Sequence, residues 1–203
     1  MKRELKRQQT WQLLLDTTQE LIREKGCAKT TFSDIMERSG LSKGAIFHYV
    51  KSKDELLAMI LQQKLEETNS RFFEGVIHED GEVRFAGPMG AIANSLPVLE
   101  ESRDITNQIF MYLLGRSDES AVEEIRRFYE QAAQFSRKWI ETGQEHGVIP
   151  QSVNADKTAD LFMLISFGLR VRGFIASDKK AFQIGDFTKL MVDILQPEKK
   201  SDR

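Results

Sequence analysis

The sequence predicts an all-α fold. Only four prolines interrupt the 203 residues, and between them apolar side chains recur every three or four positions rather than every two. Hydroxyl and amide residues that suit helix starts, and glycines that suit helix ends, divide the chain into regular segments. A hydrophobic content of 40% is enough to bury a core.

Three helices are expected within the first fifty residues. The first carries an apolar stripe from Trp11 to Ile22 and ends at Gly26. The second begins after Thr31, which with Asp34 forms a capping-box-like pair, and runs to the Ser39-Gly40 turn. The third is short and has Ile46 and Val50 on its apolar side.

A long helix then begins at Ser52, where Ser52 and Glu55 have the spacing of a capping box. It joins a head, residues 1–54, to a body, residues 55–203. In the body we expect a polar loop over 75–88, two helices on either side of Pro97, and further helices over 118–146, 155–175 and 184–195. Asn154 is expected to cap the helix over 155–175.

The helix over 155–175 is apolar on all sides, which predicts that it is buried on all sides. The helix would be buried in this way if one side packed against the core of its own chain and the other side against a second subunit. Small residues recur at heptad spacing, at Ala159, Ser166 and Gly173, and would let a helix of that subunit approach closely. Residues 187–195 are expected to form the second part of this interface. The alternative is the central helix of a monomer.

Charge is distributed unevenly along the chain. The head carries eleven Lys and Arg against seven Asp and Glu, a balance of +4, and the remaining residues carry −6. This asymmetry predicts that the head meets an anion. A single cysteine, Cys27, fits a reducing compartment, and no apolar run is long enough for a membrane span or a secretion signal, so we expect a cytoplasmic protein.

Two short helices joined by a glycine-containing turn suggest a helix-turn-helix arrangement. The stretch TTFSDIMERSGLSKGAIFHYVKSKDELL, residues 30–57, with EKG at 24–26 before it, closely resembles the DNA-binding head of the TetR/AcrR family of bacterial transcriptional regulators. The body resembles the family only in the number, length and order of its helices. The resemblance implies an all-helical homodimer, paired through its last two helices, with a body that binds small molecules.

The first turn of the predicted recognition helix, Ser42-Lys43-Gly44-Ala45, would face base edges in the major groove. Lys43 could reach the O6 and N7 acceptors of a guanine, or could contact only phosphate. Gly44 permits close backbone approach, and the Ala45 methyl group could meet a thymine methyl.

Aromatic side chains follow in the same helix. Phe47 stands where the family usually has a tyrosine that bonds a phosphate, so we expect an apolar or sugar contact from it. His48 and Tyr49 can both donate to the backbone or to a base. For Tyr49, a place in the core is the alternative.

Phosphate contacts are predicted at two helix starts. Thr31 and Ser33 lie where hydroxyls and free backbone N–H groups attract an anion, although they could simply cap the second helix. Lys53 combines its charge with the positive end of a helix dipole, which predicts a phosphate clamp, against the alternative of a solvated lysine.

An effector pocket is expected among the long helices of the body, where six side chains could line it or could be ordinary core residues: Phe110, Met111, Trp139, Met163, Phe167 and Arg170. Arg170 follows an apolar run, so it is either paired with an acid or available to an anionic ligand.

We therefore expect a sequence-specific DNA-binding regulator, a repressor released from a palindromic operator by a small hydrophobic effector that can carry an anionic group. The alternative is a DNA-binding dimer controlled by a protein partner, or one without a small ligand. An enzyme is disfavoured because no glycine-rich phosphate loop or convergent set of titratable residues is visible in the sequence. No metal site, cofactor or membrane association is expected.

Overall fold

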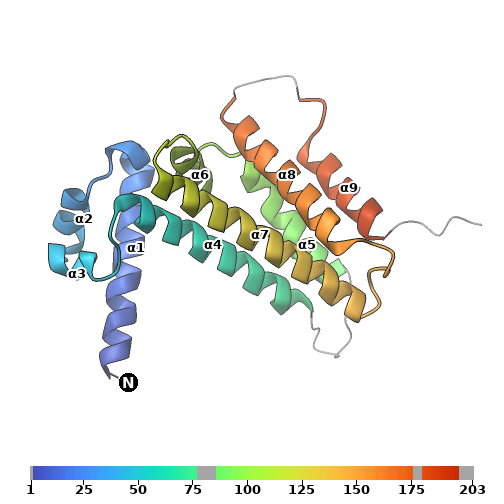
Figure 1. The fold of residues 1–203 in the computed structure, drawn as a ribbon, viewed down its shortest axis with the longest axis horizontal. Helices are drawn as coiled ribbons and strands as arrows, with labels where there is room; N and C mark the ends of the chain where they lie inside the picture. The colour runs from blue at the N-terminus through green and yellow to red at the C-terminus, as the bar shows by residue number, and fades with distance from the viewer. Residues whose placement is uncertain (1, 77–85, 176–179, 197–203) are drawn as a thin grey trace, which may run out of the picture. The chain divides into compact units, whose positions relative to one another are not determined.

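The computed structural model describes residues 2–76, 86–175 and 180–196, and within these ranges it is helical without strands, as the sequence predicts (Figure 1). The chain divides into two compact units. Unit 1 comprises Met1–Lys64 and Arg103–Phe128, and unit 2 comprises Leu65–Ser102 and Tyr129–Arg203. Two helices, α4 (Lys53–Val76) and α7 (Glu119–Glu145), contribute a segment to each unit.

Unit 1 is built around α1 (Lys2–Lys29), which packs against α2 (Phe32–Ser39) and α6 (Ile105–Leu114). The short helix α3 (Lys43–Phe47) and the starts of α4 and α7 complete this unit (Figure 1). Burial of apolar side chains from each of these helices holds them together. The fully buried residues include Leu14, Leu15, Ile22, Ile35, Ile46, Leu56, Leu57, Ile60, Leu61, Ile109 and Leu113.

The helix ends of unit 1 follow the predicted signals. The helical conformation of α1 is interrupted at Gly26, which has φ 80°. Thr31 forms a complete capping box with Asp34, and Gly40 ends α2 in the left-handed region at φ 70°, where a side chain would be strained. Ser52 accepts from the Glu55 N–H at 3.0 Å, but the Glu55 carboxylate accepts from the Lys51 N–H and does not complete the reciprocal bond.

Unit 2 contains α5 (Ala86–Ser95), a 3-10 helix over Leu96–Glu100, α8 (Ala155–Gly173) and α9 (Ile184–Leu195). The loop predicted over 75–88 overlaps two helices at its ends, since α4 runs to Val76 and α5 begins at Ala86; residues 77–85 lie outside the described ranges. Pro97 stands at the start of the 3-10 helix, where its missing N–H is not needed.

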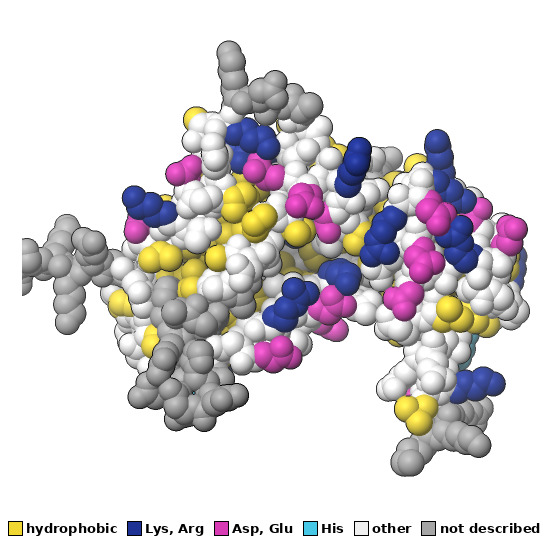
Figure 2. Space-filling model, turned by 180° about the vertical axis from the view of Figure 1, so that it is seen from behind, with side chains coloured by type: hydrophobic (Ala, Val, Ile, Leu, Met, Phe, Trp, Pro, Cys, Tyr) yellow, Lys and Arg dark blue, Asp and Glu magenta, His cyan; other side chains and the backbone are white. Residues whose placement is uncertain are grey.

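The core of unit 2 gathers apolar side chains from all of its helices. Contacts join α8 to the 3-10 helix, α5 to the 3-10 helix, and α8 to α9. On the face drawn in Figure 2, hydrophobic side chains also gather at the surface of unit 2, whereas acidic and basic side chains intermingle over unit 1. The buried set of unit 2 includes Phe72, Met89, Leu96, Leu99, Ile140, Phe162, Leu169, Phe187, Met191 and Leu195.

The small residues of α8 do not form its outer surface. Ala159 and Ser166 are buried within the chain, and a Cβ atom on Gly173 would lie only 2.6 Å from the carbonyl oxygen of Glu100. The prediction that they admit a helix of a second subunit is therefore wrong, because Gly173 admits the 3-10 helix of the same chain and the other two are already covered by that chain. The outward side of α8 carries leucines instead: Leu161 is 39% exposed and Leu164 is 59% exposed.

Candidate nucleic-acid interface

Helices α2 and α3 and the turn between them form the candidate interface. Helix α3 has only five residues, and both of its ends are satisfied locally. The Ala45 N–H donates to the Ser42 hydroxyl at 3.2 Å, and the His48 N–H donates to the carbonyl of Gly44 at 3.1 Å. Ile46 is buried beneath the helix, so its opposite side faces outward.

The outward side of α3 carries the residues predicted to meet base edges. Ser42, Lys43 and Gly44 are exposed, and Ala45 is half-buried. The Nζ atom of Lys43 lies 5.7 Å from the centre of the Phe47 ring. No heavy atom stands within 4 Å of the position of a Cβ atom on Gly44, so a second molecule can approach the backbone there.

The three aromatic residues at the end of α3 have different surroundings. Phe47 is 42% exposed, and one side of its ring contacts Phe32 with centroids 5.0 Å apart. His48 is exposed. The Tyr49 hydroxyl donates to the carbonyl oxygen of Arg7 at 3.0 Å, and its ring lies 5.4 Å from that of Trp11. This geometry favours the alternative of a packing role for Tyr49, since its donor is already used within the chain.

At the start of α2, Thr31 caps the helix. Its hydroxyl accepts from the Asp34 N–H at 3.3 Å and donates to the Asp34 carboxylate at 2.6 Å. Lys25, 2.6 Å from the same carboxylate, and the Thr31 hydrogen bonds lower the pKa of Asp34 to about 2. An ionised carboxylate beside Thr31 repels phosphate, so the geometry favours the capping role. Ser33 is exposed in the first turn.

Lys53 occupies a different place from the one predicted. Its ammonium group lies 5.0 Å from the centre of the Tyr112 ring. It also donates to three carbonyl oxygens at and just after the end of α1: Cys27 at 3.0 Å, Thr30 at 3.2 Å and Ala28 at 3.5 Å. A lysine ammonium has three protons to donate. The geometry therefore favours a structural role for Lys53, which joins the end of α1 to the start of α4, over the predicted phosphate clamp.

Sequence reasoning missed the residues that surround Lys53 in unit 1. Arg116, just after α6, lies 3.3 Å from the buried carboxylate of Asp54 and 5.8 Å from the centre of the Tyr112 ring. The charge of Asp54 raises the pKa of Arg116. Residues 54 and 116 are far apart in the chain, and no local pattern marks them as partners.

The predicted effector-binding residues fall into both units. Phe110, which is buried, and Met111 belong to unit 1. In unit 2 the Trp139 indole N–H donates to the Asn69 side-chain oxygen at 2.8 Å, and its ring stacks on Phe72 with centroids 4.9 Å apart.

The remaining three predicted effector residues lie on α8. Met163 is partly buried against the core of unit 2, and the Phe167 ring lies 5.4 Å from that of Tyr129. Tyr129 in turn donates a short hydrogen bond to Asp160. Arg170 is half-buried and already interacts within the chain, which favours the alternative of an internal partner.

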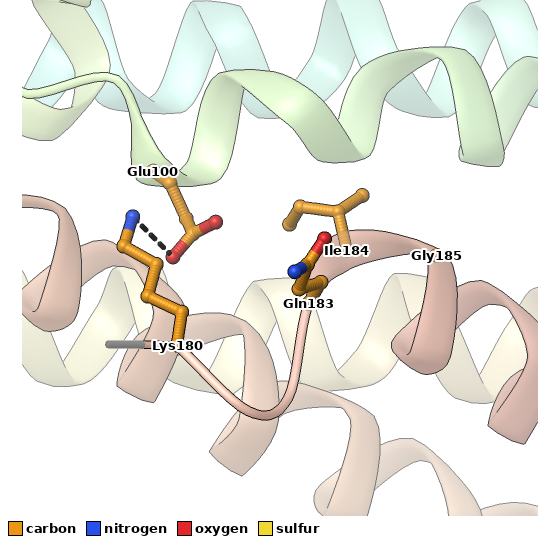
Figure 3. Close-up of a pocket in the computed structure, with 5 residues that line it drawn as sticks. All are labelled: Glu100, Lys180, Gln183, Ile184 and Gly185. Carbon is orange, nitrogen blue, oxygen red and sulfur yellow. Dashed lines mark ion pairs between the residues drawn. The ribbon is translucent and has the colours of Figure 1, made fainter. Parts of the chain in front are cut away.

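A surface hollow of about 370 Å³ lies at the start of α9, lined by Glu100, Lys180, Gln183, Ile184 and Gly185 (Figure 3). Lys180 forms an ion pair with Glu100 at 3.2 Å, and Arg172 donates to the same carboxylate at 2.8 Å. These cations lower the pKa of Glu100 against the effect of burial. None of the predicted effector residues lines this hollow.

Within the described ranges, no helix combines the length and apolar character that crossing a membrane requires. The same residues contain no cluster of three or more His, Cys, Asp or Glu side chains arranged to hold a metal ion.

Residues 14–60, which contain α2, α3 and their turn, match the family model described as "Bacterial regulatory proteins, tetR family". The helix-turn-helix head of the chain is thus that of the TetR/AcrR family of transcriptional regulators. The chain is 26% identical over 173 residues to the uncharacterized HTH-type transcriptional regulator YvkB of Bacillus subtilis, covering 82% of this chain and 84% of YvkB. It is 26% identical over 190 residues to the HTH-type transcriptional regulator TtgR of Pseudomonas putida, covering 90% and 88%.

The fold extends this likeness to solved structures. The SmeT–triclosan complex, of Stenotrophomonas maltophilia SmeT, aligns with a TM-score of 0.63 at 18% identity, covering 92% of this chain and 89% of SmeT. With a head of this family, the chain is a DNA-binding transcriptional regulator and not an enzyme. Its α2–turn–α3 segment is the helix-turn-helix of that family.

Proposed function

We propose that this protein is a sequence-specific repressor, which acts in the cytoplasm as a homodimer on a palindromic operator and is released by a small hydrophobic effector. The observation that carries the proposal is the outward side of α3, where Lys43, Gly44 and His48 are exposed while Ile46 is buried beneath them. A helix that is anchored from one side and exposed on the other can enter a major groove without losing its fold. Residues 1–54 bind DNA, and residues 55–203 dimerise and bind the effector.

Lys43 reads a guanine in this proposal, while other cations contact phosphates. Lys6 and Lys51 are exposed. Tyr49 holds the N-terminal part of α1 beside α3 through its bond to Arg7, which keeps Lys6 close to the recognition helix. Because Lys53 is engaged by carbonyl oxygens, Lys51 is the better candidate for a phosphate contact at the start of α4.

The test is selection of bound duplexes from a random-sequence library, followed by affinity measurements on the enriched duplex and on random DNA at several salt concentrations. We expect a palindromic sequence whose affinity falls steeply with salt, because bound cations displace counterions. Lys51→Ala should weaken both duplexes alike, whereas Lys43→Ala should weaken mainly the enriched one. Failure to enrich any sequence would refute the proposal.

The homodimer is supported by apolar side chains at the surface of unit 2. Leu161, Leu164 and Ile175 are exposed on or just after α8, and Val192 is exposed on α9. Exposed apolar patches commonly mark interfaces between proteins. To enter successive major grooves, a twofold dimer must hold its two recognition helices about 34–36 Å apart, and its symmetry then matches a palindromic operator.

Control by a hydrophobic effector is supported by the likeness to SmeT, which has been solved with triclosan and is the repressor of a multidrug efflux pump in its organism. Within unit 2, the partly buried Trp139, Met163 and Phe167 supply apolar surface, and Asn69 supplies a polar atom next to Trp139. Arg170 already interacts within the chain, and a guanidinium has further N–H donors for an anionic group.

Effector control is tested by reciprocal titration. A hundredfold release from DNA needs about 2.7 kcal/mol of coupling, and linkage requires that operator DNA weaken effector binding by the same factor. Calorimetry with and without saturating operator measures this for each hydrophobic candidate. A protein that carries no bound ligand and responds to none of them would favour control by a protein partner.

A further inference from the structure

The exposed ring of Phe47 has no counterpart on the rest of the outward side of α3. Lys43, Gly44 and His48 are polar or lack a side chain, whereas Phe47 leaves 42% of its surface in contact with water. Ile46 and Val50, both buried, already supply the apolar anchor of this segment. The exposed part of the ring therefore contributes little to the core and presents apolar surface where the helix meets DNA.

Two neighbours hold the ring in place. Phe32 of α2 contacts one side, with ring centroids 5.0 Å apart and ring planes at 51°. Lys43, one helical turn earlier, places its ammonium group 5.7 Å from the ring centre. The ring is thus fixed beside a cation that is attracted to DNA. The backbone of Gly44, where nothing lies within 4 Å of a Cβ position, belongs to the same helix.

The chemistry of the major groove offers one apolar group on a base edge, the C5-methyl group of thymine. A phenylalanine ring cannot bond a phosphate, since it has no donor. We propose that Phe47 is a specificity-determining residue that packs against a thymine methyl group in each operator half-site. This inference rests on the proposed function and identifies one base of the sequence that the protein reads.

The position of this thymine follows from the helix. Lys43 and Phe47 are four residues apart, which separates them by about 6 Å along the axis of α3. Base pairs are stacked about 3.4 Å apart, so this distance spans fewer than two steps. The methyl-dependent thymine should lie within two base pairs of the position at which Lys43→Ala relaxes specificity.

The probe is the enriched palindromic duplex with each thymine in turn replaced by deoxyuridine at the same place in both half-sites, which removes only the methyl group. Burying one methyl group changes affinity by a factor of about four. Replacing the thymine that Phe47 contacts in both half-sites should therefore lower the affinity about fifteenfold. At that position 5-methylcytosine should bind more tightly than cytosine by a similar factor. Fluorescence anisotropy at fixed salt measures each dissociation constant.

Two variants assign the effect to a residue. In Phe47→Ala the penalty for deoxyuridine should vanish, whereas in Ala45→Gly, which removes the other methyl-sized candidate, it should persist. Circular dichroism checks that each variant folds, and Phe47→Gln, which suits an exposed helix position, replaces Phe47→Ala if that variant does not. A sugar contact by Phe47 would leave no thymine whose sensitivity to deoxyuridine depends on Phe47, and this result would overturn the inference.

The outcomes separate this inference from the function on which it rests. If no duplex is enriched from the library, the proposed function fails. If a duplex is enriched but deoxyuridine has no effect, or if its effect survives in the Phe47 variant and disappears in Ala45→Gly, the regulator remains and the role of Phe47 is refuted.

Discussion

Helices α3 and α8 expose opposite kinds of surface. Helix α3 buries Ile46 and turns polar side chains and one aromatic ring outward, while α8 buries small residues and turns Leu161 and Leu164 outward. The first surface suits a charged, hydrated polymer such as DNA. The second suits the apolar surface of another chain, because leucines lose unfavourable contact with water when covered.

The two helices also differ in how they are held. Helix α3 has five residues and depends on its caps and one buried side chain, whereas α8 has nineteen residues and packs closely on the 3-10 helix through Gly173. Substitutions should therefore affect mainly binding at α3 and mainly folding at the inward side of α8. Five substitutions, two of them paired with a control, test this difference and extend it to the helices next to α3.

The largest effect is expected at Gly173. A Cβ atom there would overlap the Glu100 backbone, so Gly173→Leu should lower the free energy of unfolding by about 3 kcal/mol. Gly168→Ala is the matched control on the same helix, since no atom lies within 4 Å of its Cβ position, and it should raise stability by about 0.5–1 kcal/mol. Urea unfolding measures both. Equal stability of the two variants would contradict the packing of α8 on the 3-10 helix.

A charge on the outward side of α8 should act on assembly. Leu164→Glu places a carboxylate in the proposed interface and should weaken the dimer by about 2 kcal/mol or more, with little change in the unfolding of the isolated subunit. Val122→Glu, at another exposed apolar position, is the control and should leave the dimer intact. Analytical ultracentrifugation distinguishes them, and dimers of equal affinity would place the interface elsewhere.

At α3, a substitution should change recognition and leave folding intact. Lys43→Ala removes an exposed side chain and should cost about 1–3 kcal/mol on the enriched duplex, with relaxed preference at one base pair. Its thermal unfolding should match that of the wild type. Equal losses on enriched and random DNA would show that Lys43 contacts only phosphate.

Lys53 should show the opposite behaviour. Lys53→Met keeps the apolar stem but removes the donor to the carbonyl oxygens after Gly26, so it should lower stability by about 1 kcal/mol. The salt dependence of DNA binding should stay unchanged if the ammonium group is engaged as the structure shows. A shallower salt slope with unchanged stability would restore the phosphate clamp.

The smallest effect concerns acid. Asp34 has a pKa lowered to about 2 in the folded protein, so its ionised form contributes stability above the pKa of an unfolded aspartate, about 3.9. That contribution should be lost as the pH falls from about 4 to about 2. Asp34→Asn should flatten this part of the stability curve relative to the wild type, and an identical acid dependence would contradict the ion pair with Lys25.

Local signals made much of the fold predictable. The caps at Thr31 and Asn154, the end of α2 at Gly40 and the limits of α9 all lie where the sequence placed them, because a cap bonds to residues within its own helical turn. These are short-range interactions that a pattern of a few residues encodes completely.

Long-range partners were not predictable in the same way. The carbonyl oxygens around Lys53 come from residues more than twenty positions earlier, and the bond between Trp139 and Asn69 spans seventy. When a helix is apolar on all sides, as α8 is, its sequence also does not indicate which side packs against the rest of its own chain. At the candidate interface, the sequence located the residues of α3, but the partners of Tyr49 and Lys53 required the packed structure.

The construction of α3 has a consequence for evolution. Its fold depends on Ser42, Ile46 and the turn at Gly40, whereas Lys43, Gly44 and His48 are exposed and add little to it. Mutations at those three positions can therefore accumulate without unfolding the head. A duplicated copy of this gene could acquire a new operator in a few substitutions, and the same freedom lets regulator and promoter drift together.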